Sequence, residues 1–134
     1  MKNQLDHILL IDDNAADNFF NETMIRRSCY IQRLTVVQTA EAALLFLRSD
    51  ENGKPPKPDL IFLDINMPRM NGWEFLDEYK KLDERQKASI VIVMLTTSLN
   101  PEDMEKAQAI DEINDFRNKP ISESAILEII ESHF

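Results

Sequence analysis

Three carboxylates and one amine stand at the ends of short apolar segments of the sequence. These residues are Asp12, Asp13, Asp64 and Lys119. Two carboxylates about 4 Å apart repel each other by about 4 kcal/mol at an effective dielectric of roughly 20, so carboxylates that meet need a counter-charge. Mg²⁺ is the expected one, because it takes carboxylate oxygens, waters and a phosphate oxygen as ligands. The set predicts a metal-plus-phosphoryl site.

Asp64 is the candidate nucleophile of this site, since a carboxylate can accept a phosphoryl group as an acyl phosphate. Lys119 would supply a positive charge for a phosphoryl oxygen, and the hydroxyl of Thr96 would supply a hydrogen-bond donor. Each residue alone has a simpler explanation, because an aspartate can open a turn or begin a helix and a lysine can be solvated. The functional interpretation therefore depends on their convergence in space.

The segments that must bring these residues together alternate between strands and helices. Apolar runs predict buried strands, and apolar residues at helical spacing predict helices. The expected strands are His7–Ile11, Leu34–Val37, Leu60–Asp64, Ser89–Leu95 and Ile113–Phe116. The expected helices are Ala15 to about Ser28, Ala40 to about Ser49, Trp73–Leu82, Pro101 to about Ile110, and a last one opened by Ser122–Ser124. This (βα)₅ order predicts a parallel sheet in a three-layer α/β/α sandwich.

The apolar residues of the first helix lead to two further expectations. In the first helix, Ala16, Phe20, Met24 and Arg27 recur at helical spacing, and one ring of the pair Phe19 and Phe20 is expected in the core. The apolar pattern therefore predicts which side of this helix packs on the sheet.

Glycine and proline mark the expected turns. The segment Asp50–Pro58 contains Gly53 and three prolines, and it is the longest predicted loop, at the end of the sheet away from Asp64. The dipeptide Asn71–Gly72 is expected to interrupt the chain before the third helix. Because parallel strands end at the same edge, the candidate site residues should gather at the opposite end from this loop.

Composition excludes several classes of function. The 134 residues suit a single domain, 1–134, and the net charge of −9 argues against direct DNA binding. Only two glycines are present, which excludes glycine-rich phosphate loops. No apolar run approaches the roughly 18 residues of a membrane span. The single Cys29 and an N-terminus without an apolar signal region favour a cytoplasmic location.

In their order along the chain, these residues resemble the CheY-like receiver domain of bacterial two-component response regulators. The matching segments are Asp12–Asp13, Leu63–Pro68 followed by Asn71–Gly72, Thr96, and Lys119–Pro120. The resemblance covers the whole chain and implies a flavodoxin-like sheet of order 2-1-3-4-5. It also implies a stand-alone receiver, similar to some that partner phytochromes.

The resemblance implies a role for each residue of the site. Asp64 would accept a phosphoryl group from a histidine kinase, a phosphotransfer protein or a small phosphodonor. Asp13 and Asp64 would bind Mg²⁺ directly, with Asp12 assisting. Asn66 would contribute its backbone carbonyl to the metal, and the Lys119–Pro120 peptide would be cis.

The resemblance also implies how the phosphorylated state is used. Thr96 and Phe116 would form a switch pair that alters the surface of the segment Pro101–Phe134, where a downstream protein partner would bind. Asn66 and Ser98 would tune the lifetime of the acyl phosphate. The chain departs from many receivers in having Thr97 after the switch threonine and Ile113-Asn114-Asp115 before Phe116.

Two alternatives belong to other functional classes. A haloacid-dehalogenase-type phosphatase also uses an aspartyl phosphate and Mg²⁺, but it wants a second acid two residues after the nucleophile, where this chain has Asn66. A phosphorylation-independent adaptor would not need the set of Asp13, Asp64, Thr96 and Lys119. We therefore expect a signalling protein that is no enzyme beyond catalysing its own phosphorylation and dephosphorylation.

Overall fold

The structure, a computed structural model, describes residues 4–88, 91–96, 101–119 and 121–134, with the side chains of residues 4 and 91–96 left out. The strands are β1 (Gln4–Ile11), β2 (Tyr30–Val37), β3 (Leu60–Asp64), β4 (Val91–Thr96) and β5 (Ile113–Asn118). The helices are α1 (Ala15–Ser28), α2 (Ala40–Arg48), α3 (Gly72–Tyr79), the 3₁₀ helix η1 (Glu84–Gln86), α4 (Pro101–Gln108) and α5 (Glu123–His133). The alternation of strands and helices is as predicted.

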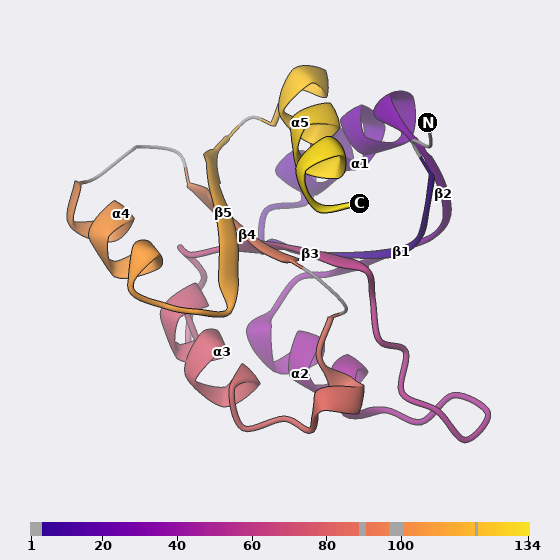
Figure 1. Ribbon diagram of the computed structural model, residues 1–134. Helices are drawn as coiled ribbons and strands as arrows, with labels where there is room; N and C mark the ends of the chain where they lie inside the picture. The colour runs from indigo at the N-terminus through magenta and orange to yellow at the C-terminus, as the bar shows by residue number, and fades with distance from the viewer. Residues whose placement is uncertain (1–3, 89–90, 97–100, 120) are drawn as a thin grey trace.

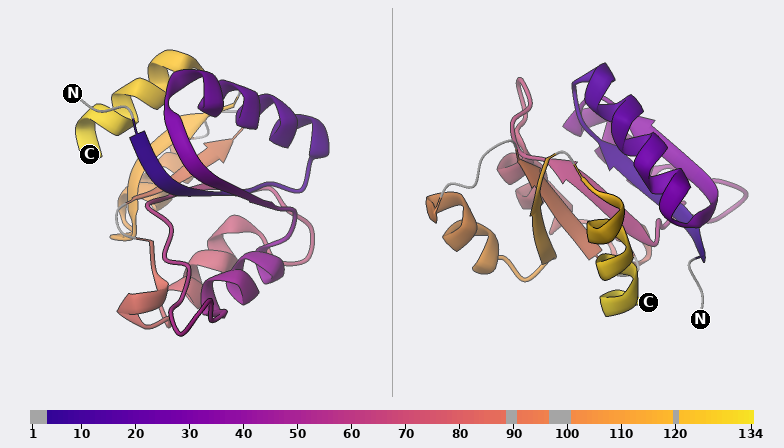
Figure 2. Two further views of the ribbon diagram at one scale, coloured as in Figure 1. Left: turned by 90° about the vertical axis from the view of Figure 1, so that its right-hand side faces the viewer. Right: turned by 90° about the horizontal axis from the view of Figure 1, so that it is seen from above.

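The five strands form one parallel sheet in the order β2-β1-β3-β4-β5. Helices α1 and α5 cover one face of the sheet and α2 and α3 the other, while α4 lies beside β5 (Figure 1). The view from above in Figure 2 shows α1 and α5 next to each other over the sheet. The predicted flavodoxin-like sandwich and its strand order are confirmed. Among the helices that the structure describes, none has the length and hydropathy needed to cross a membrane.

The central strands are buried on both faces, which is why their sequences are continuously apolar. Along β1, Leu9 and Ile11 pack into a cluster with α2 and α3, whereas Ile8 and Leu10 pack into a second cluster with α1 and α5. All four side chains have no exposed surface. A shift of one residue in this register would exchange the side chains of the two clusters, so the register of β1 depends on how these side chains fit and not on their polarity.

The edge strands reach further than predicted. β2 begins at Tyr30 rather than Leu34, and β5 continues to Asn118 rather than ending at Phe116. Both strands carry exposed or half-buried polar side chains along most of their length. An edge strand with mixed polarity lacks the continuous apolar run that identifies a central strand, so its ends are poorly marked in the sequence.

The inner face of α1 differs from the prediction. Its buried residues are Asn18, Asn21 and Ile25, whereas the predicted Ala16 is exposed. Phe19 and Phe20 are both exposed, 74% and 42%, so neither ring enters the core. The apolar periodicity failed because α1 packs on the sheet with two asparagines, one of which donates a hydrogen bond to backbone.

Several helices begin at a side-chain cap that satisfies a free backbone N–H group. The caps of α1, α2, α3 and α5 are Asn14, Thr39, Asn71 and Ser122. At α3, Asn71 accepts from the backbone of Glu74 while the Glu74 carboxylate accepts from the backbone of Asn71. The Asn71–Gly72 dipeptide therefore starts a helix rather than interrupting the chain, which corrects the prediction.

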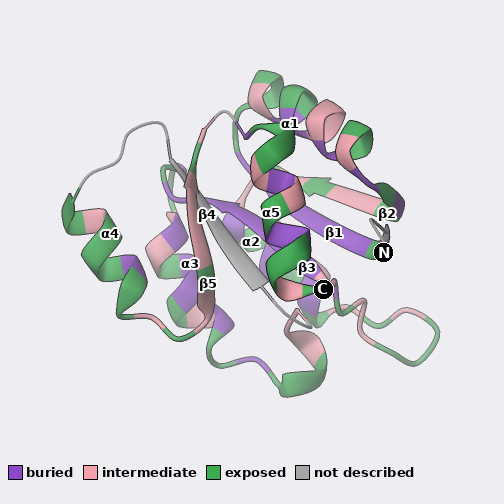
Figure 3. Cartoon of the chain, turned by 45° about the horizontal axis from the view of Figure 1, so that its top comes forward, coloured by how far each residue is buried: buried purple, intermediate pink, exposed green. Residues whose placement is uncertain are grey.

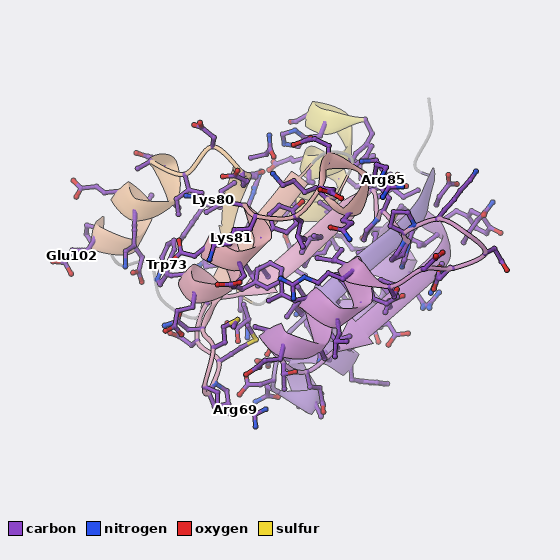
Figure 4. The ribbon with its side chains drawn as sticks, turned by 90° about the horizontal axis from the view of Figure 1, so that it is seen from below. Arg69, Trp73, Lys80, Lys81, Arg85 and Glu102 are labelled. Atoms are coloured by element: carbon purple, nitrogen blue, oxygen red, sulfur yellow. The ribbon has the colours of Figure 1, made fainter. Side chains whose placement is uncertain are left out.

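Helices α3 and α4 also touch through one aromatic contact. The Nζ atom of Lys106 on α4 lies 4.8 Å from the centre of the Trp73 ring on α3. Figure 4 shows Trp73 at the side of α3 that faces α4, with Arg69 in the loop before it. A cation over an indole face contributes about 0.5–1 kcal/mol at an exposed site, so this contact adds to an otherwise modest attachment of α4.

Gly72 lies where α3 approaches the end of β3. Its N–H donates to the carbonyl of Ile65 at 2.9 Å. A Cβ atom built on Gly72 would lie 2.7 Å from the Cα of Ile65 and 3.0 Å from the carbonyl oxygen of Asp64. Only glycine lets α3 begin this close to the strand that carries Asp64.

We expect Gly72→Ala to lower the free energy of unfolding by about 1–3 kcal/mol, because the new methyl group meets backbone atoms that cannot rotate away. Urea denaturation measures the loss. Ala16→Ser is a matched control, since it also adds one heavy atom to a helix but at an exposed position, and it should stay within about 0.5 kcal/mol of the unmodified protein. Equal stability of the two variants would contradict the close approach.

Candidate functional site

The sheet brings the predicted acidic residues to one edge. Asp12 directly follows β1, and Asp64 is the last residue of β3. Ile11 pairs with Leu63 across these neighbouring strands, so the two carboxylates start from adjacent backbone positions. The N–H of Asp12 also donates to the carbonyl of Val37 on β2 at 3.2 Å, which fixes the chain as it leaves the sheet.

Asp12, Asp13 and Asp64 each offer a carboxylate oxygen within 4.8 Å of the others. Asp12 is fully buried, Asp64 is 3% exposed, and Asp13 is exposed. At such spacing and burial, negative charges repel strongly unless positive charge is close. The predicted convergence of the carboxylates is present in the structure.

Lys119, one residue beyond β5, provides that positive charge. Its Nζ atom lies 2.6 Å from Oδ2 of Asp12 and 3.6 Å from Oδ1 of Asp64. A third carboxylate, that of Asp17, accepts a hydrogen bond from the same atom at 3.0 Å. Burial works against the charged ammonium, yet these carboxylates outweigh it and raise the pKa of Lys119.

Asp64 is electrostatically strained in this arrangement. Burial is the largest cause, and with the neighbouring charge of Asp12 it raises the pKa of Asp64 to about 7. The ammonium of Lys119 and the backbone N–H of Asn66, which donates to Oδ1 at 3.2 Å, act in the opposite direction. Lys119 alone therefore does not balance the carboxylates, and a further cation would stabilise the ionised form of Asp64.

The residues present fit a hard divalent cation. Oδ1 of Asp12 accepts the backbone N–H of Asn14 at 3.0 Å. Oδ2 of Asp12 lies 2.6 Å from the ammonium of Lys119, with which it forms an ion pair. The carboxylate oxygens of Asp12, Asp13 and Asp64, all within 4.8 Å of one another, form a donor set of the kind that such cations select.

The remaining predicted residues are placed only in part. The side chain of Asn66 is exposed, directly beyond Asp64. Thr96 is the last residue of β4 and pairs with Asn118, but its side chain lies outside the described part of the structure. The described residues also leave out Ser98 and the neighbouring Thr97. They leave out Pro120 as well, and with it the predicted cis peptide.

Phe116, the other member of the predicted switch pair, is half-buried on β5 and packs against the α2 and α3 side of the core. With Met104 and Ala107 of α4 it lines a groove of about 300 Å³ between α4 and β5. The ring is thus neither fully outward nor fully inserted in the core.

Asp17 is the site residue that sequence reasoning missed. It lies in the first turn of α1, and its backbone N–H is bound by the cap residue Asn14. An acid in a first helical turn is common for reasons of helix electrostatics, so its type and position gave no sign of a second role. Its contact with Lys119 joins positions 102 residues apart, and only the fold reveals it.

Comparison with known proteins points to one family. The family model of the response regulator receiver domain matches residues 8–131. Response regulator Rcp1 of Synechocystis sp. is 35% identical over 98 residues, which cover 72% of this chain and 65% of Rcp1. The chain therefore spans about two thirds of that relative.

Solved structures agree with this match. A two-component response regulator from Cytophaga hutchinsonii aligns with a TM-score of 0.85 and 31% identity over 96% of both chains. The phosphorylated cyanobacterial phytochrome response regulator RcpA aligns with a TM-score of 0.73 and 27% identity over 96% of this chain and 90% of that chain. With the strand order and the convergent carboxylates, these similarities lead to one conclusion. The chain belongs to the response regulator receiver domain family, a family of signalling domains.

Proposed function

We propose that this protein is a phosphorylation-controlled receiver whose phosphoacceptor is Asp64. The observation that carries the proposal is the environment of Asp64, which is buried at the end of β3 with Lys119 at 3.6 Å and with carboxylates of Asp12 and Asp13 within 4.8 Å. A nucleophile needs its reactive oxygen close to groups that hold the incoming phosphoryl oxygens. The family match and the phosphorylated state of RcpA support the same chemistry.

In the proposed reaction, an ionised oxygen of Asp64 attacks the phosphorus atom of a phosphodonor. With a phosphohistidine of a kinase or phosphotransfer protein, the P–N bond breaks and its electron pair remains on the imidazole. With acetyl phosphate, the P–O bond breaks and acetate leaves. Lys119 binds a phosphoryl oxygen in this reaction. Its positive charge offsets the repulsion between the negative phosphoryl group and the three carboxylates.

Mg²⁺ is the proposed cofactor, because hard oxygen ligands and a phosphoryl oxygen suit it. We assign Asp13 and Asp64 as its direct carboxylate ligands, Asp12 as an assisting residue and Asn66 as the donor of a backbone carbonyl. When bound, the ion would neutralise negative charge around the phosphoryl group. The three carboxylates, each with an oxygen within 4.8 Å of the others, support this assignment.

We further propose that the protein acts as a stand-alone receiver over residues 1–134 and passes its state to a protein partner. In this proposal the hydroxyl of Thr96 moves toward the phosphoryl group and Phe116 fills the space behind it. The partner then recognises the changed surface of α4, β5 and α5. The half-buried ring of Phe116 and its groove with α4 support a side chain that can occupy two positions. Asn66 and Ser98 would set how fast water removes the phosphoryl group.

The first test of this function is phosphorylation by acetyl phosphate with Mg²⁺, followed by intact-mass measurement. We expect one phosphoryl group on the unmodified protein and none on Asp64→Asn. Asp77→Asn is the matched control, because it makes the same change at an exposed acid of α3, and it should be phosphorylated normally. A label on Asp64→Asn would contradict the assignment. Sustained hydrolysis of a phosphate ester would favour the phosphatase alternative, and no label on any variant would favour the adaptor.

A second test concerns the metal. Asp13 has no hydrogen bond or ion pair among the described residues, so its removal does not also disturb Lys119. We expect Asp13→Asn to weaken Mg²⁺ binding at least roughly tenfold in calorimetric titration, since even residues one layer outside a metal contribute that much. Asp77→Asn should bind Mg²⁺ unchanged. Equal affinities in these two variants would remove Asp13 from the site.

A third test concerns the switch. A charge-assisted hydrogen bond contributes about 1.5–3 kcal/mol, enough to shift a two-state equilibrium about tenfold to a hundredfold. Beryllofluoride, a non-covalent mimic of the phosphoryl group, should therefore move the amide resonances of Phe116 and its neighbours on β5 and α4. Thr96→Ala should bind the mimic but lose most of these distant shifts. Shifts confined to the acidic residues in both proteins would contradict the switch.

A further inference from the structure

The ion pair between Asp17 and Lys119 links helix α1 to the candidate phosphoacceptor site. The ammonium of Lys119 is only 8% exposed, and it contacts the carboxylates of Asp12 and Asp17 more closely than that of Asp64. The side chain of Asp17 is 40% exposed and lies in the first turn of α1. One buried cation is therefore shared among three acids, one of which belongs to a helix and not to a strand end.

Helix α1 depends on polar contacts to an unusual extent. Its inner face contains Asn18 and Asn21, with Ile25 as its fully buried apolar residue. The Nδ2 atom of Asn18 donates to the carbonyl of Asp12 at 2.8 Å, but Oδ1 of Asn18 and Nδ2 of Asn21 have no hydrogen-bond partner among the described residues. The first half of α1 thus buries few apolar side chains, and the contacts of Asp17 and Asn18 attach it to the site.

The outer face of the same half of α1 is apolar. Phe19 and Phe20 lie two and three residues after Asp17 and are both exposed. Figure 3 shows α1 as a helix with much exposed surface along its outer side. A change in the contact of Asp17 would therefore act on a segment that presents two aromatic rings to solvent.

We propose that Asp17 is a positioning residue that holds Lys119 away from Asp64 in the unphosphorylated protein and releases it when Asp64 carries a phosphoryl group. This inference rests on the proposed phosphorylation of Asp64. The phosphoryl oxygens offer Lys119 more negative charge than the carboxylate of Asp64 does, so they compete with Asp17 for the same ammonium. The first turn of α1, with Phe19 and Phe20, then loses one of its ties to the site.

The contact between Asp17 and Lys119 should oppose phosphorylation of Asp64. Any interaction made by Lys119 in the unphosphorylated state, and lost in the phosphorylated one, opposes phosphorylation by the same free energy. The negative charge of Asp17 also repels the incoming anion. Removing that charge should therefore favour the phosphorylated state on both counts. A purely structural role for the ion pair would instead reduce stability without changing this balance.

The test compares beryllofluoride affinity, with Mg²⁺ present, for Asp17→Asn and the unmodified protein. We expect about fivefold tighter binding for Asp17→Asn, as is typical of a partly exposed ion pair. Asp17→Glu keeps the charge and should return the affinity toward that of the unmodified protein. Glu22→Gln removes the same charge from α1 at a residue that pairs with Arg26, and it should change nothing. Asp17→Ser repeats the test without an amide.

The amide resonances of residues 15–20 give a second readout. A purely structural ion pair would not make them depend on beryllofluoride. In the unmodified protein they should shift when beryllofluoride binds. In Asp17→Asn they should already lie near the bound positions and shift little further. Unchanged affinity in Asp17→Asn and Asp17→Ser, or α1 resonances that ignore beryllofluoride, would overturn the role of Asp17 while leaving phosphorylation intact. No beryllofluoride binding and no acyl phosphate in the unmodified protein would overturn the proposed function and this inference together.

Discussion

The structure depends on the balance of charge at the edge of the sheet, between the carboxylates of Asp12, Asp13 and Asp64 and the ammonium of Lys119. Asp12 and Asp64 are both buried, so their charges are poorly screened, and Lys119 is the cation that lies between them. A buried cation contributes stability only where its acids are held in place, because desolvation of each ion is costly. The parallel pairing of β1 and β3 provides that placement, and the balance it leaves is still incomplete, as the raised pKa of Asp64 indicates. A site with such a surplus of negative charge could bind a metal cation.

Helices of both layers contact the backbone at this same edge. Gly72 begins α3 against the backbone of Asp64 and Ile65, and Asn18 of α1 binds the backbone of Asp12. Both contacts involve main-chain atoms of residues in the site or next to it, so α1 and α3 are each attached to it directly. At the other end of the sheet, the segment that follows the long loop is attached to β1, because Asp59 and His7 are hydrogen-bonded through their backbones and through the Asp59 carboxylate.

Most of the fold and the acidic site could be predicted because strong, local signals encode them. Continuous apolar runs identify central strands, and a polar residue at the end of such a run must lie at the sheet edge. Three features escaped prediction for physical reasons. The inner face of α1 carries two asparagines, so apolar periodicity wrongly placed one phenylalanine ring in the core, and Asp17 meets Lys119 only through the tertiary fold. The edge strands β2 and β5 were predicted too short because they carry exposed polar residues and lack a continuous apolar run.

The contact between Trp73 and Lys106 gives the molecule an optical property. Trp73 is the chain's one tryptophan, so its fluorescence comes from a single place, the junction of α3 and α4. The indole excited state is sensitive to a nearby positive charge, and the ammonium of Lys106 is 4.8 Å from the ring centre. The colour and intensity of emission are thereby tied to the position of α4 relative to α3. Tryptophan fluorescence can therefore report the position of α4 without an attached dye.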